Sequence, residues 1–369
     1  MTMKPYIPSK LPLTNLDYKK LFTLVGEANA QLARYDGLLQ GVINPEVMLS
    51  PLTNEEAVLS SKIEGTQATV DEVLEQEAGM FKEGEKGKDI QEIINYRAAL
   101  ISGHHHLNKR PMTLFFLREL HKILMKSVRG EDKTPGAFRK DQNWIGKQGC
   151  TIEEASFIPP DPVHLQEYLE DWQQYIEFDD IDTLLQAAVI HAQFELIHPF
   201  KDGNGRIGRI LIPLFLYQKK KLSQPMFYLS AYLEAHREEY YYRLQNISEH
   251  EDWSGWIAFF FKAIIHQAKS NNQKLKAIID LYEEMKKEIH EITRSQYTIQ
   301  LLDAVFDRPI FSANDFAIRS KIHKKTVDAL LKQLRGANIL TTLRESRGRT
   351  SMILCFPKLL NIAEGRKIV

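Results

Sequence analysis

The densest group of chemically capable side chains is the run HPFKDGNGRIGR, residues 198–209. His198 can carry a proton at neutral pH, because an unperturbed imidazole has a pKa of about 6.5. The glycines of the run let the backbone adopt positive φ and approach a ligand closely. Arg206 and Arg209 are three residues apart, so a helix starting near Gly205 places both guanidiniums on one face, where they suit phosphate. These residue types predict a phosphate-binding turn that carries one general base.

Two apolar segments flank this run and predict the helices that position it. Residues 182–197 are typical of a buried helix, and Pro199 places His198 at or near its end. A second helix is expected over residues 206–217. The free N–H groups at its start and the backbone of residues 202–205 can form an anion-binding nest. Asp202 adds a hard oxygen suited to Mg²⁺, which binds phosphates through few protein ligands.

Other interpretations of the same residues fit less well. The spacing Gly203-x-Gly205-x-x-Gly208 matches a dinucleotide fingerprint, but that motif must follow a strand, and here a helix is expected. Glu195-x-x-His198, with His191 one turn earlier, could be half of a carboxylate-bundle metal site, yet the chain has no second Glu-x-x-His. A P-loop is excluded because no Gly-Lys-Ser/Thr occurs. An ordinary helix–helix turn leaves the convergence of base, acid, glycines and arginines unexplained.

The run resembles the signature of the Fic (Fic/Doc) family of protein adenylyltransferases, His-x-Phe-x-(Asp/Glu)-Gly-Asn-Gly-Arg-x-x-Arg, without departure. The resemblance extends less closely to PGAFRKDQNWIG, to FIPP and to YLSAYLEAHREEYYYRL. It also extends to the N-terminal helices and the C-terminal winged helix common in larger bacterial members, and so covers most of the chain. It implies transfer of AMP from ATP to a Ser, Thr or Tyr hydroxyl of a target protein, with release of pyrophosphate. Some members of the family transfer a different phosphoryl-containing group or remove AMP.

The resemblance also implies a role for each residue of the site. His198 would take the proton of the attacking hydroxyl, Asp202 would hold Mg²⁺, and Phe200 would anchor the loop. Residues 150–159 would form a flap that aligns the target by strand addition. The ATP- and phosphate-binding residues would be Gly203, Asn204, Gly205, Arg206, Ile207, Gly208 and Arg209, with Tyr240 and Tyr241 at the nucleoside, although two tyrosines on a helix are equally well explained as core.

A second motif, Ser60-x-x-x-Glu64-Gly65, fits the inhibitory Ser/Thr-x-x-x-Glu-Gly/Asn motif of many Fic proteins. Alone it is weak, since an ordinary solvent-facing helix end would have the same residues. In the family context, Glu64 would pair with Arg209 and occupy the guanidinium that the γ-phosphate needs. Glu64 could instead position a water for the reverse reaction, the removal of AMP, and the sequence does not separate these roles.

The chain divides into three expected regions, which give a mainly α fold. Residues 1–88 form an N-terminal helical region that carries the inhibitory helix at about 55–65, and residues 89–285 form the helical Fic core with a small β-hairpin flap. The boundaries rest on two polar stretches taken as linkers, 79–89 and 286–295. Residues 291–369 are expected to form a winged helix-turn-helix, with helices over 297–306, 312–319 and 324–335 and a hairpin over 339–343 and 352–356.

The C-terminal region is the basic part of a neutral chain. The whole sequence has 48 Lys and Arg against 48 Asp and Glu, whereas residues 291–369 have 14 against 7. Lys321, Lys324 and Lys325 precede or begin the expected recognition helix, and Arg344, Arg347 and Arg349 lie near the wing, a distribution that suits DNA phosphates. A protein-interaction module explains them equally well. The alternative function is therefore a DNA-binding regulator with a nucleotide-sensing pocket, although a sensor would not need the base His198.

Composition excludes several other classes of protein. The two cysteines, Cys150 and Cys355, are far apart, which excludes a disulfide scaffold and a cysteine zinc site. No stretch has the length and apolar character of a signal peptide or a membrane span. We therefore expect a cytoplasmic protein with no membrane partner. By the resemblance we also expect a homodimer that uses ATP and Mg²⁺ and modifies a target protein and itself.

Overall fold

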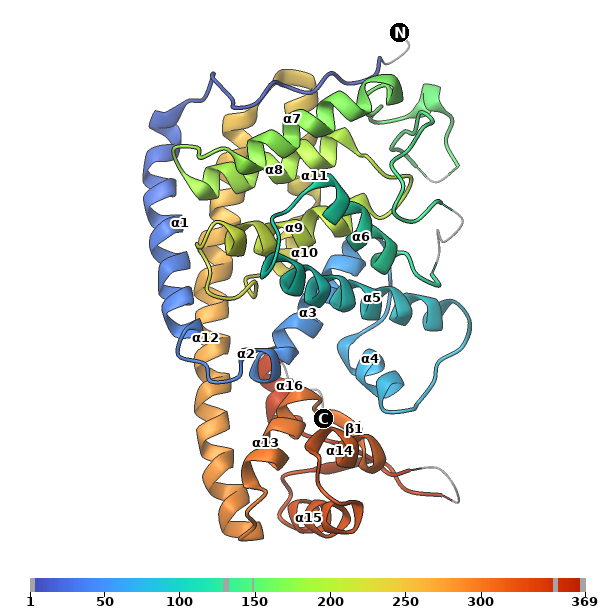
Figure 1. Cartoon of the computed structure of the whole chain (residues 1–369), viewed down its shortest axis with the longest axis vertical. Helices are drawn as coiled ribbons and strands as arrows, with labels where there is room; N and C mark the ends of the chain where they lie inside the picture. The colour runs from blue at the N-terminus through green and yellow to red at the C-terminus, as the bar shows by residue number, and fades with distance from the viewer. Residues whose placement is uncertain (1–3, 129–132, 148, 348–350, 366–369) are drawn as a thin grey trace.

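The computed structural model describes residues 4–128, 133–147, 149–347 and 351–365. Helices dominate these residues, and the sheet formed within them is a three-stranded one near the C-terminus. Figure 1 shows a large helical upper part and a smaller lower part, joined along one side by a long helix. The predicted mainly α fold is confirmed.

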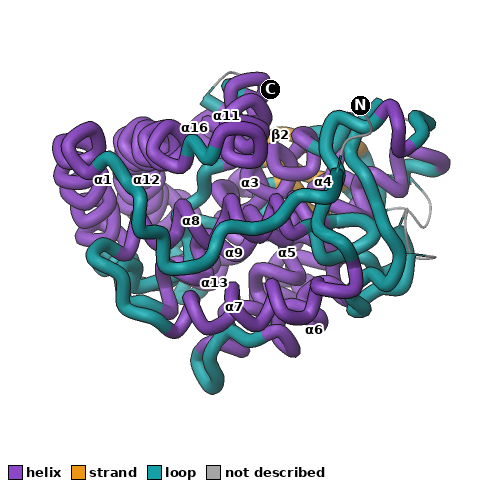
Figure 2. The backbone as a smooth tube through the Cα atoms, turned by 90° about the horizontal axis from the view of Figure 1, so that it is seen from above, coloured by secondary structure: helices purple, strands orange, loops and turns teal. Residues whose placement is uncertain are grey.

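The N-terminal region begins with a strap, which we define as residues 4–17, that crosses the top of the helical core (Figures 1 and 2). Tyr6 donates its backbone N–H to the carbonyl of Ile158 over 2.9 Å. Gln193 donates from its side chain to the carbonyl of Ser9 over 2.8 Å. The strap therefore fastens the loop around Ile158 to the core. It leads into α1 (Tyr18–Leu39), α2 (Pro45–Met48), α3 (Ser50–Ile63) and α4 (Val70–Glu77).

The helical core contains α5 (Gly84–Leu107), α6 (Leu114–Leu124), α7 (Leu165–Glu177), α8 (Thr183–Ile197) and α9 (Asn204–Gln218). Nearly every residue of α8 and α9 is buried, as the apolar sequences predict. Gly103 allows α5 to lie close to α9, because a Cβ there would come within 2.5 Å of a Leu214 methyl. Helices α10 (Ser230–Ala235), α11 (Arg237–His250) and α12 (Trp253–Thr293) complete the upper part.

Both stretches taken as linkers are partly helical, so those two expectations are wrong. Helix α5 already begins at Gly84. Helix α12 continues without interruption to Thr293, because Met285 and Ile289 repeat at four-residue spacing and keep one face buried. The polar composition of these segments reflects a solvated helix face, since Lys and Glu are good helix formers. The expected boundary at 88/89 falls inside α5, and the one after 285 falls inside α12.

The lower part consists of α13 (Thr298–Asp307), β1 (Ile310–Ser312), α14 (Ala313–Ser320), α15 (Lys324–Gly336), β2 (Thr341–Arg344), β3 (Ile353–Cys355) and α16 (Pro357–Glu364). The strand order is β1-β3-β2, and both pairings are antiparallel, with Cys355 opposite Ile310 on one side and Thr341 on the other. The expected three helices and hairpin are present. The strand β1 and the helix α16 were not expected from the sequence.

The loop between α6 and α7 pairs far less than a β-hairpin flap would. Within its described residues, the antiparallel pairing is one isolated bridge, Ile145 with Phe157, and a short 3-10 turn covers Ile152–Glu154. Pro159 and Pro160, which follow Phe157, cannot donate to a ladder, so the pairing cannot extend in that direction. The expected hairpin is therefore corrected to a loop held by one bridge.

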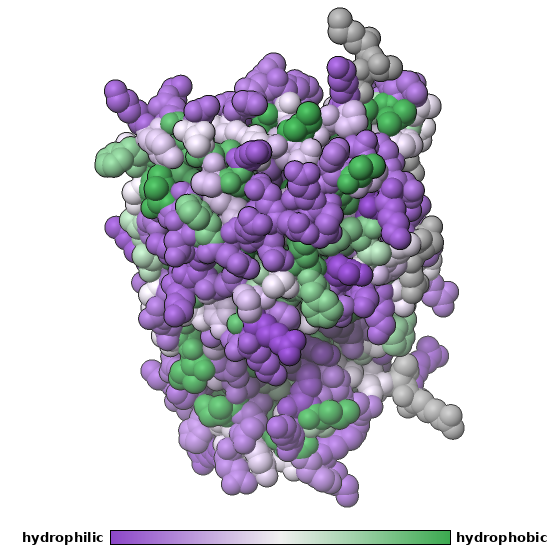
Figure 3. All heavy atoms as spheres, turned by 45° about the horizontal axis from the view of Figure 1, so that its top comes forward, coloured by the Kyte–Doolittle hydropathy of each residue, from purple (hydrophilic) through white to green (hydrophobic). Residues whose placement is uncertain are grey.

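The surface shown in Figure 3 is mainly hydrophilic, with hydrophobic side chains in scattered positions. Among the described residues, no helix combines the length and the apolar character needed to cross a membrane.

Candidate active site

The predicted turn joins α8 to α9 and changes the chain direction through two left-handed residues. His198 caps α8 with φ +51° and ψ +59°, and its N–H still donates to the carbonyl of Phe194. Gly203 precedes α9 with φ +75°. A non-glycine residue with positive φ is uncommon and costs free energy, so the surrounding contacts must hold His198 in place.

Asn204 and Phe200 hold the loop between these two residues. The Asn204 side chain accepts a hydrogen bond from the Phe200 N–H and donates one to the Phe200 carbonyl, both over 2.8 Å. Phe200 is fully buried, as expected of an anchor. The Asn204 amide, expected at phosphate, is engaged inside the loop.

His121 of α6 supports the same loop and was not singled out from the sequence. Its ring stacks on Phe200 with centroids 3.9 Å apart. Nδ1 accepts from the Gly136 N–H over 2.8 Å, and Nε2 lies 3.0 Å from the Asp202 carbonyl, to which it donates. Burial lowers the pKa of His121 to about 4, which keeps the ring neutral with one donor and one acceptor. No motif marks this histidine, because its partners are distant in sequence.

Arg139 is a second support that sequence reasoning missed. Its Nε donates to the His198 carbonyl over 2.9 Å, and its Nη2 donates to the Pro160 carbonyl over 2.6 Å. The side chain is almost completely buried. Arg139 therefore ties the left-handed His198 to the loop that leads into α7. Its place in the AFRK stretch was the available signal.

Arg209 is held by α3, the helix that carries Ser60 and leads to Glu64. Its Nε donates to the Ser60 hydroxyl over 2.8 Å, and its Nη2 donates to the Ser60 carbonyl over 2.9 Å and to Glu64 Oε1 over 2.6 Å. Desolvation alone would raise the pKa of Glu64, but the charge and hydrogen bond of Arg209 outweigh it and lower that pKa. Glu64 is therefore ionised near neutral pH. Gly65 ends the helix with φ +103°.

Arg206 does not share a ligand-facing surface with Arg209. It is buried, its Nη1 donates to Glu92 Oε2 of α5 over 2.9 Å, and its Nη2 lies 3.7 Å from Asp202 Oδ1. Both arginines lie on α9 as expected, but the buried Glu92 carboxylate of α5 holds the Arg206 guanidinium. Arg206 therefore links the start of α9 to α5 and to Asp202.

A cavity of about 1150 Å³ opens beside this junction. The loop between α6 and α7 forms one wall, with Trp144, Cys150 and Phe157 among its lining residues. The sequence-predicted residues that line the cavity are His198, Gly205, Arg209, Glu64, Tyr240 and Tyr241. The other sequence-predicted site residues are not among its lining residues: Ser60, Gly65, Asp202, Gly203, Asn204, Arg206, Ile207 and Gly208.

The two tyrosines have different surroundings. Tyr240 is buried, and its hydroxyl lies 3.0 Å from His191 Nε2. Tyr241 is 43% exposed, and the guanidinium carbon of Arg237 lies 5.8 Å from its ring centroid. Tyr240 therefore belongs to the core with one edge on the cavity, whereas Tyr241 is open to a ligand. The other ring nitrogen of His191, Nδ1, lies 3.0 Å from the Gly208 carbonyl. Both nitrogens therefore have protein partners, and neither is directed at a metal site.

The acid–base state of His198 suits proton acceptance. Burial lowers the pKa of His198 to about 4, so the ring is neutral at pH 7. Its Nδ1 lies 3.3 Å from the Glu195 carbonyl. If Nδ1 carries the hydrogen and donates it there, Nε2 is free to accept a proton.

Glu195 is a cavity-lining carboxyl whose protonation differs from that of Glu64. Burial raises the pKa of Glu195 to about 8, and its Oε1 is buried without a hydrogen-bond partner. A Cβ on Gly208 would lie 2.2 Å from this oxygen, so the Glu195 carboxyl would have to move if any other residue replaced the glycine. In the sequence, Glu195 stands out only as part of the Glu195-x-x-His198 spacing.

Asp202 fits a Mg²⁺ ion that is held mainly by phosphates. Its side chain is 43% exposed, and its Oδ1 accepts from the Gly203 N–H over 2.6 Å. No group of three or more His, Cys, Asp or Glu suited to a metal occurs among the described residues. A single accessible carboxylate is the kind of protein ligand that Mg²⁺ uses beside a nucleotide.

Comparisons with known proteins agree with this geometry. The chain is 27% identical over 199 residues to a probable protein adenylyltransferase of Aquifex aeolicus, covering 52% of this chain and 57% of that protein. It is 27% identical over 150 residues to the protein adenylyltransferase fic-1 of Caenorhabditis elegans, covering 38% of this chain and 27% of that protein. The chain thus spans about half or less of the length of these relatives.

Solved structures share the fold. A Fic family protein from Desulfovibrio desulfuricans G20 has a TM-score of 0.58 at 19% identity, covering 95% of this chain and 98% of that one. A Fic-domain signalling protein from Bacteroides thetaiotaomicron has a TM-score of 0.55 at 17% identity, covering 68% of this chain and 97% of that one.

Two family descriptions match adjoining parts of the sequence. Residues 22–105 match the Fic/DOC family N-terminal region, and residues 111–216 match the Fic/DOC family itself. Together they take in just over half of the chain, including α3 with Ser60 and the junction from His198 to Arg209. The chain belongs to the Fic/DOC family.

Proposed function

We propose that this protein transfers AMP from ATP to a Ser, Thr or Tyr hydroxyl of a protein, with release of pyrophosphate. The observation that carries the proposal is the neutral His198 imidazole, which opens on a large cavity shared with the guanidinium of Arg209. The relatives named protein adenylyltransferases support the same activity.

In this reaction the target hydroxyl attacks the α-phosphorus, and the bond from that phosphorus to the bridging oxygen of the β-phosphate breaks. His198 takes the proton of the hydroxyl, and pyrophosphate leaves. The N-terminus of α9 and Gly205 face the phosphates, where aligned N–H groups favour negative charge. Asp202 would hold Mg²⁺, which neutralises phosphate charge when bound.

Tyr241, exposed at the cavity beside Arg237, would contact the nucleoside. The loop residues 150–159 form part of the cavity wall and would align the target segment, including a segment of another copy of this chain. Because this loop pairs through one bridge, its backbone groups are available for strand addition.

We further propose that the protein is autoinhibited by Glu64. The carboxylate accepts a hydrogen bond from the Arg209 guanidinium and places negative charge where the γ-phosphate would lie. Removal of AMP by a water that Glu64 positions stays an alternative role for the same residue.

The experiment that tests the transfer uses ATP labelled at the α- or the γ-phosphate. We expect the purified protein to retain the α-label and not the γ-label, and His198→Ala to abolish labelling. His323→Ala, at an exposed histidine of the lower part, is the matched control and should label like wild type. Retention of the γ-label, or full labelling by His198→Ala, would contradict the proposal.

A second proposal concerns the lower part. Lys321, Lys324 and Lys325 are exposed where α14 gives way to α15, a placement that suits DNA phosphates in a winged helix-turn-helix. Arg344 donates to the Ser351 carbonyl over 3.3 Å, and Arg349 lies outside the described residues. Salt-sensitive binding to duplex DNA that Lys324→Glu weakens would support a DNA-binding regulator.

If the nucleotide pocket of such a regulator were only a sensor, the protein would bind ATP without any transfer. The homodimer and the cytoplasmic location stay predictions.

A further inference from the structure

A bracket, which we define as residues 139–143, lies between the turn that carries His198 and the end of the loop that forms one wall of the active-site cavity. Its Gln142 side chain donates to the Pro159 carbonyl of the loop over 2.9 Å. Its Asn143 side chain donates to the Phe200 carbonyl of the turn over 3.3 Å. The bracket therefore holds the turn and the loop through separate bonds, and its Arg139 side chain contacts both.

Residue 139 serves three consecutive carbonyls where α8 ends. The Arg139 backbone N–H donates to the Pro199 carbonyl over 2.9 Å, and its Nε donates to the His198 carbonyl over 2.9 Å. Its Nη2 lies 3.4 Å from the Ile197 carbonyl. The last carbonyls of a helix lack partners within the helix. Because His198 turns the chain out of the helix, Arg139 supplies the donors that a further helical turn would have supplied.

The same guanidinium holds the end of the loop. Its Nη2 donates to the Pro160 carbonyl over 2.6 Å, and its Nη1 lies 3.4 Å from the Asp141 carbonyl. Arg139 is 2% exposed, so solvent does not compete for these donors. A guanidinium directs five N–H groups in one plane and can bridge two segments, whereas the donors of an ammonium group spread from a single atom.

The position of His198 is the property that these bonds control. Its left-handed conformation costs about 1–3 kcal/mol and persists only where the surroundings hold it. A general base must lie within hydrogen-bond reach of the proton that it accepts, and a displacement of about 1 Å can cost about 100-fold in rate. None of the Arg139 bonds described above reaches Arg209 or Gly205, where the phosphates would lie.

We propose that Arg139 is a positioning residue for His198, and that it fixes the imidazole relative to the loop along which the target segment would lie. The inference rests on the proposed AMP transfer, because it takes His198 to accept the proton of the target hydroxyl. Loss of the guanidinium should slow the transfer without weakening ATP, since α9 and not the bracket holds the phosphates.

Arg139→Lys tests this role, because it keeps the charge but cannot bridge the two segments. We use the full chain with Glu64→Gly as the parent, so that Glu64 limits neither ATP binding nor transfer. The rate constant of self-labelling at saturating α-labelled ATP should fall about tenfold or more. The dissociation constant of ATP should change by less than about twofold. An unchanged rate constant, or a loss confined to ATP affinity, would overturn the proposal.

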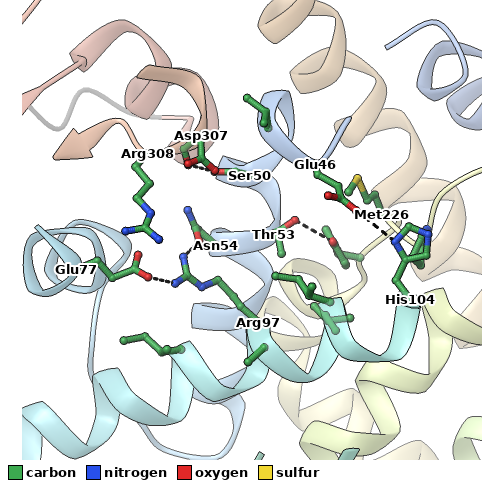
Figure 4. A pocket seen from close by; sticks show the side chains of 17 residues that line it. Glu46, Ser50, Thr53, Asn54, Glu77, Arg97, His104, Met226, Asp307 and Arg308 are labelled. Carbon is green, nitrogen blue, oxygen red and sulfur yellow. Dashed lines mark hydrogen bonds and ion pairs between the residues drawn. The ribbon is translucent and has the colours of Figure 1, made fainter. Parts of the chain in front are cut away.

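Arg97→Gln is the matched control for loss of a mostly buried arginine. Arg97 donates to Asn54 and Glu77 beside a separate cavity of about 380 Å³ (Figure 4). Its removal should lower stability, because partners of the guanidinium lose their donors. The rate constant should nevertheless equal that of the Glu64→Gly parent. If Arg97→Gln slowed labelling as much as Arg139→Lys does, the loss would reflect stability alone and the positioning role would be refuted.

A spectrum of the imidazole separates this inference from the proposed function. In protein with ¹³C-labelled histidine rings, the His198 signal is identified by its loss in His198→Ala. We expect it to shift and broaden in Arg139→Lys and to stay unchanged in Arg97→Gln. An unchanged signal in Arg139→Lys would overturn the positioning role whether or not the protein transfers AMP. A shifted signal in a parent that does not label would support the positioning role and contradict only the proposed function.

Gln142→Ala provides the same test if Arg139→Lys does not fold. Gln142 is partly exposed, and its removal loosens the bracket only at Pro159. We expect the rate constant to fall about threefold, with ATP affinity unchanged and a smaller shift of the His198 signal. An unchanged rate constant together with an unchanged signal would refute the link between the loop and His198.

Discussion

Glu64 and Arg209 are 145 residues apart in sequence and form an ion pair of 2.6 Å at the wall of the 1150 Å³ cavity. The guanidinium is almost completely buried, whereas the carboxylate is one-third exposed. Arg209 is therefore enclosed by the protein, whereas Glu64 is accessible to solvent. Release of Glu64 from this pair needs no movement of α9.

Replacing Glu64 should activate the protein. We expect Glu64→Gly to increase labelling by α-labelled ATP about tenfold or more, because the negative charge at the γ-phosphate position is removed. Glu64→Gln should give an intermediate increase, since it keeps a hydrogen-bond acceptor for Arg209 but loses the charge. Labelling rates of purified proteins measure both effects.

Glu75→Gln on the neighbouring α4 is the control, because its partner Lys82 lies outside the cavity. Wild-type rates for both Glu64 variants would show that the ion pair does not restrain the reaction. The double variant Glu64→Gly, His198→Ala should be inactive.

Removing the Ser60 hydroxyl should loosen Arg209 without removing the inhibitory charge. Ser60→Ala leaves the Arg209 Nε buried without its 2.8 Å acceptor, which costs about 1–3 kcal/mol of unfolding free energy. The expected labelling rate lies between those of wild type and Glu64→Gly. Urea unfolding and labelling measure the two quantities, and an unchanged stability would show that the bond contributes nothing.

Gly208 and Glu195 should be energetically coupled. Gly208→Ala brings a methyl group to within 2.2 Å of Glu195 Oε1, and we expect a destabilisation of about 1–3 kcal/mol. In a Glu195→Ala background the same change should cost less, because the opposing carboxyl is gone. A double-mutant cycle in urea gives the coupling, and strict additivity would contradict the contact.

Glu56 should make stability depend on pH. Burial raises its pKa to about 7, despite hydrogen bonds from Ser230 and Tyr96. The folded state therefore holds a proton that the unfolded state loses near pH 4.5, and this contribution falls away as pH rises from about 4.5 through 7.

Glu56→Gln should remove that dependence. Its amide can donate to the Ser230 and Tyr96 hydroxyls and accept from the Ser230 N–H, so the network survives. Relative to wild type, the variant should gain up to about 3 kcal/mol of unfolding free energy between pH 5 and pH 8. Denaturation at both pH values measures the difference, and parallel pH profiles for the two proteins would refute it.

The helix junction could be predicted from the sequence because its signals are local. Pro199 ends one helix, Gly203 starts the next, and the apolar runs on either side determine their burial. The partner of Arg206 could not be predicted in the same way. Glu92 is 114 residues away, and spacing on one helix does not tell which element covers each side chain.

The same limit explains the supports of His198. His121 and Arg139 act through backbone carbonyls and an N–H group, for which the sequence has no code. The expected linkers failed for a different reason. Residues 286–293 are mostly polar, which suggested a linker. They are nevertheless helical, because Ile289 keeps one face of the helix buried.

The 41-residue helix α12 runs without interruption from the upper part of the molecule into the lower part. At 1.5 Å per residue it extends about 60 Å, from beside the catalytic junction to the base of the lower part. If binding of another molecule moved the lower part, it would therefore tilt α12, whose upper half packs against α8. The lower part therefore cannot move independently of the upper part, as it could on a flexible linker.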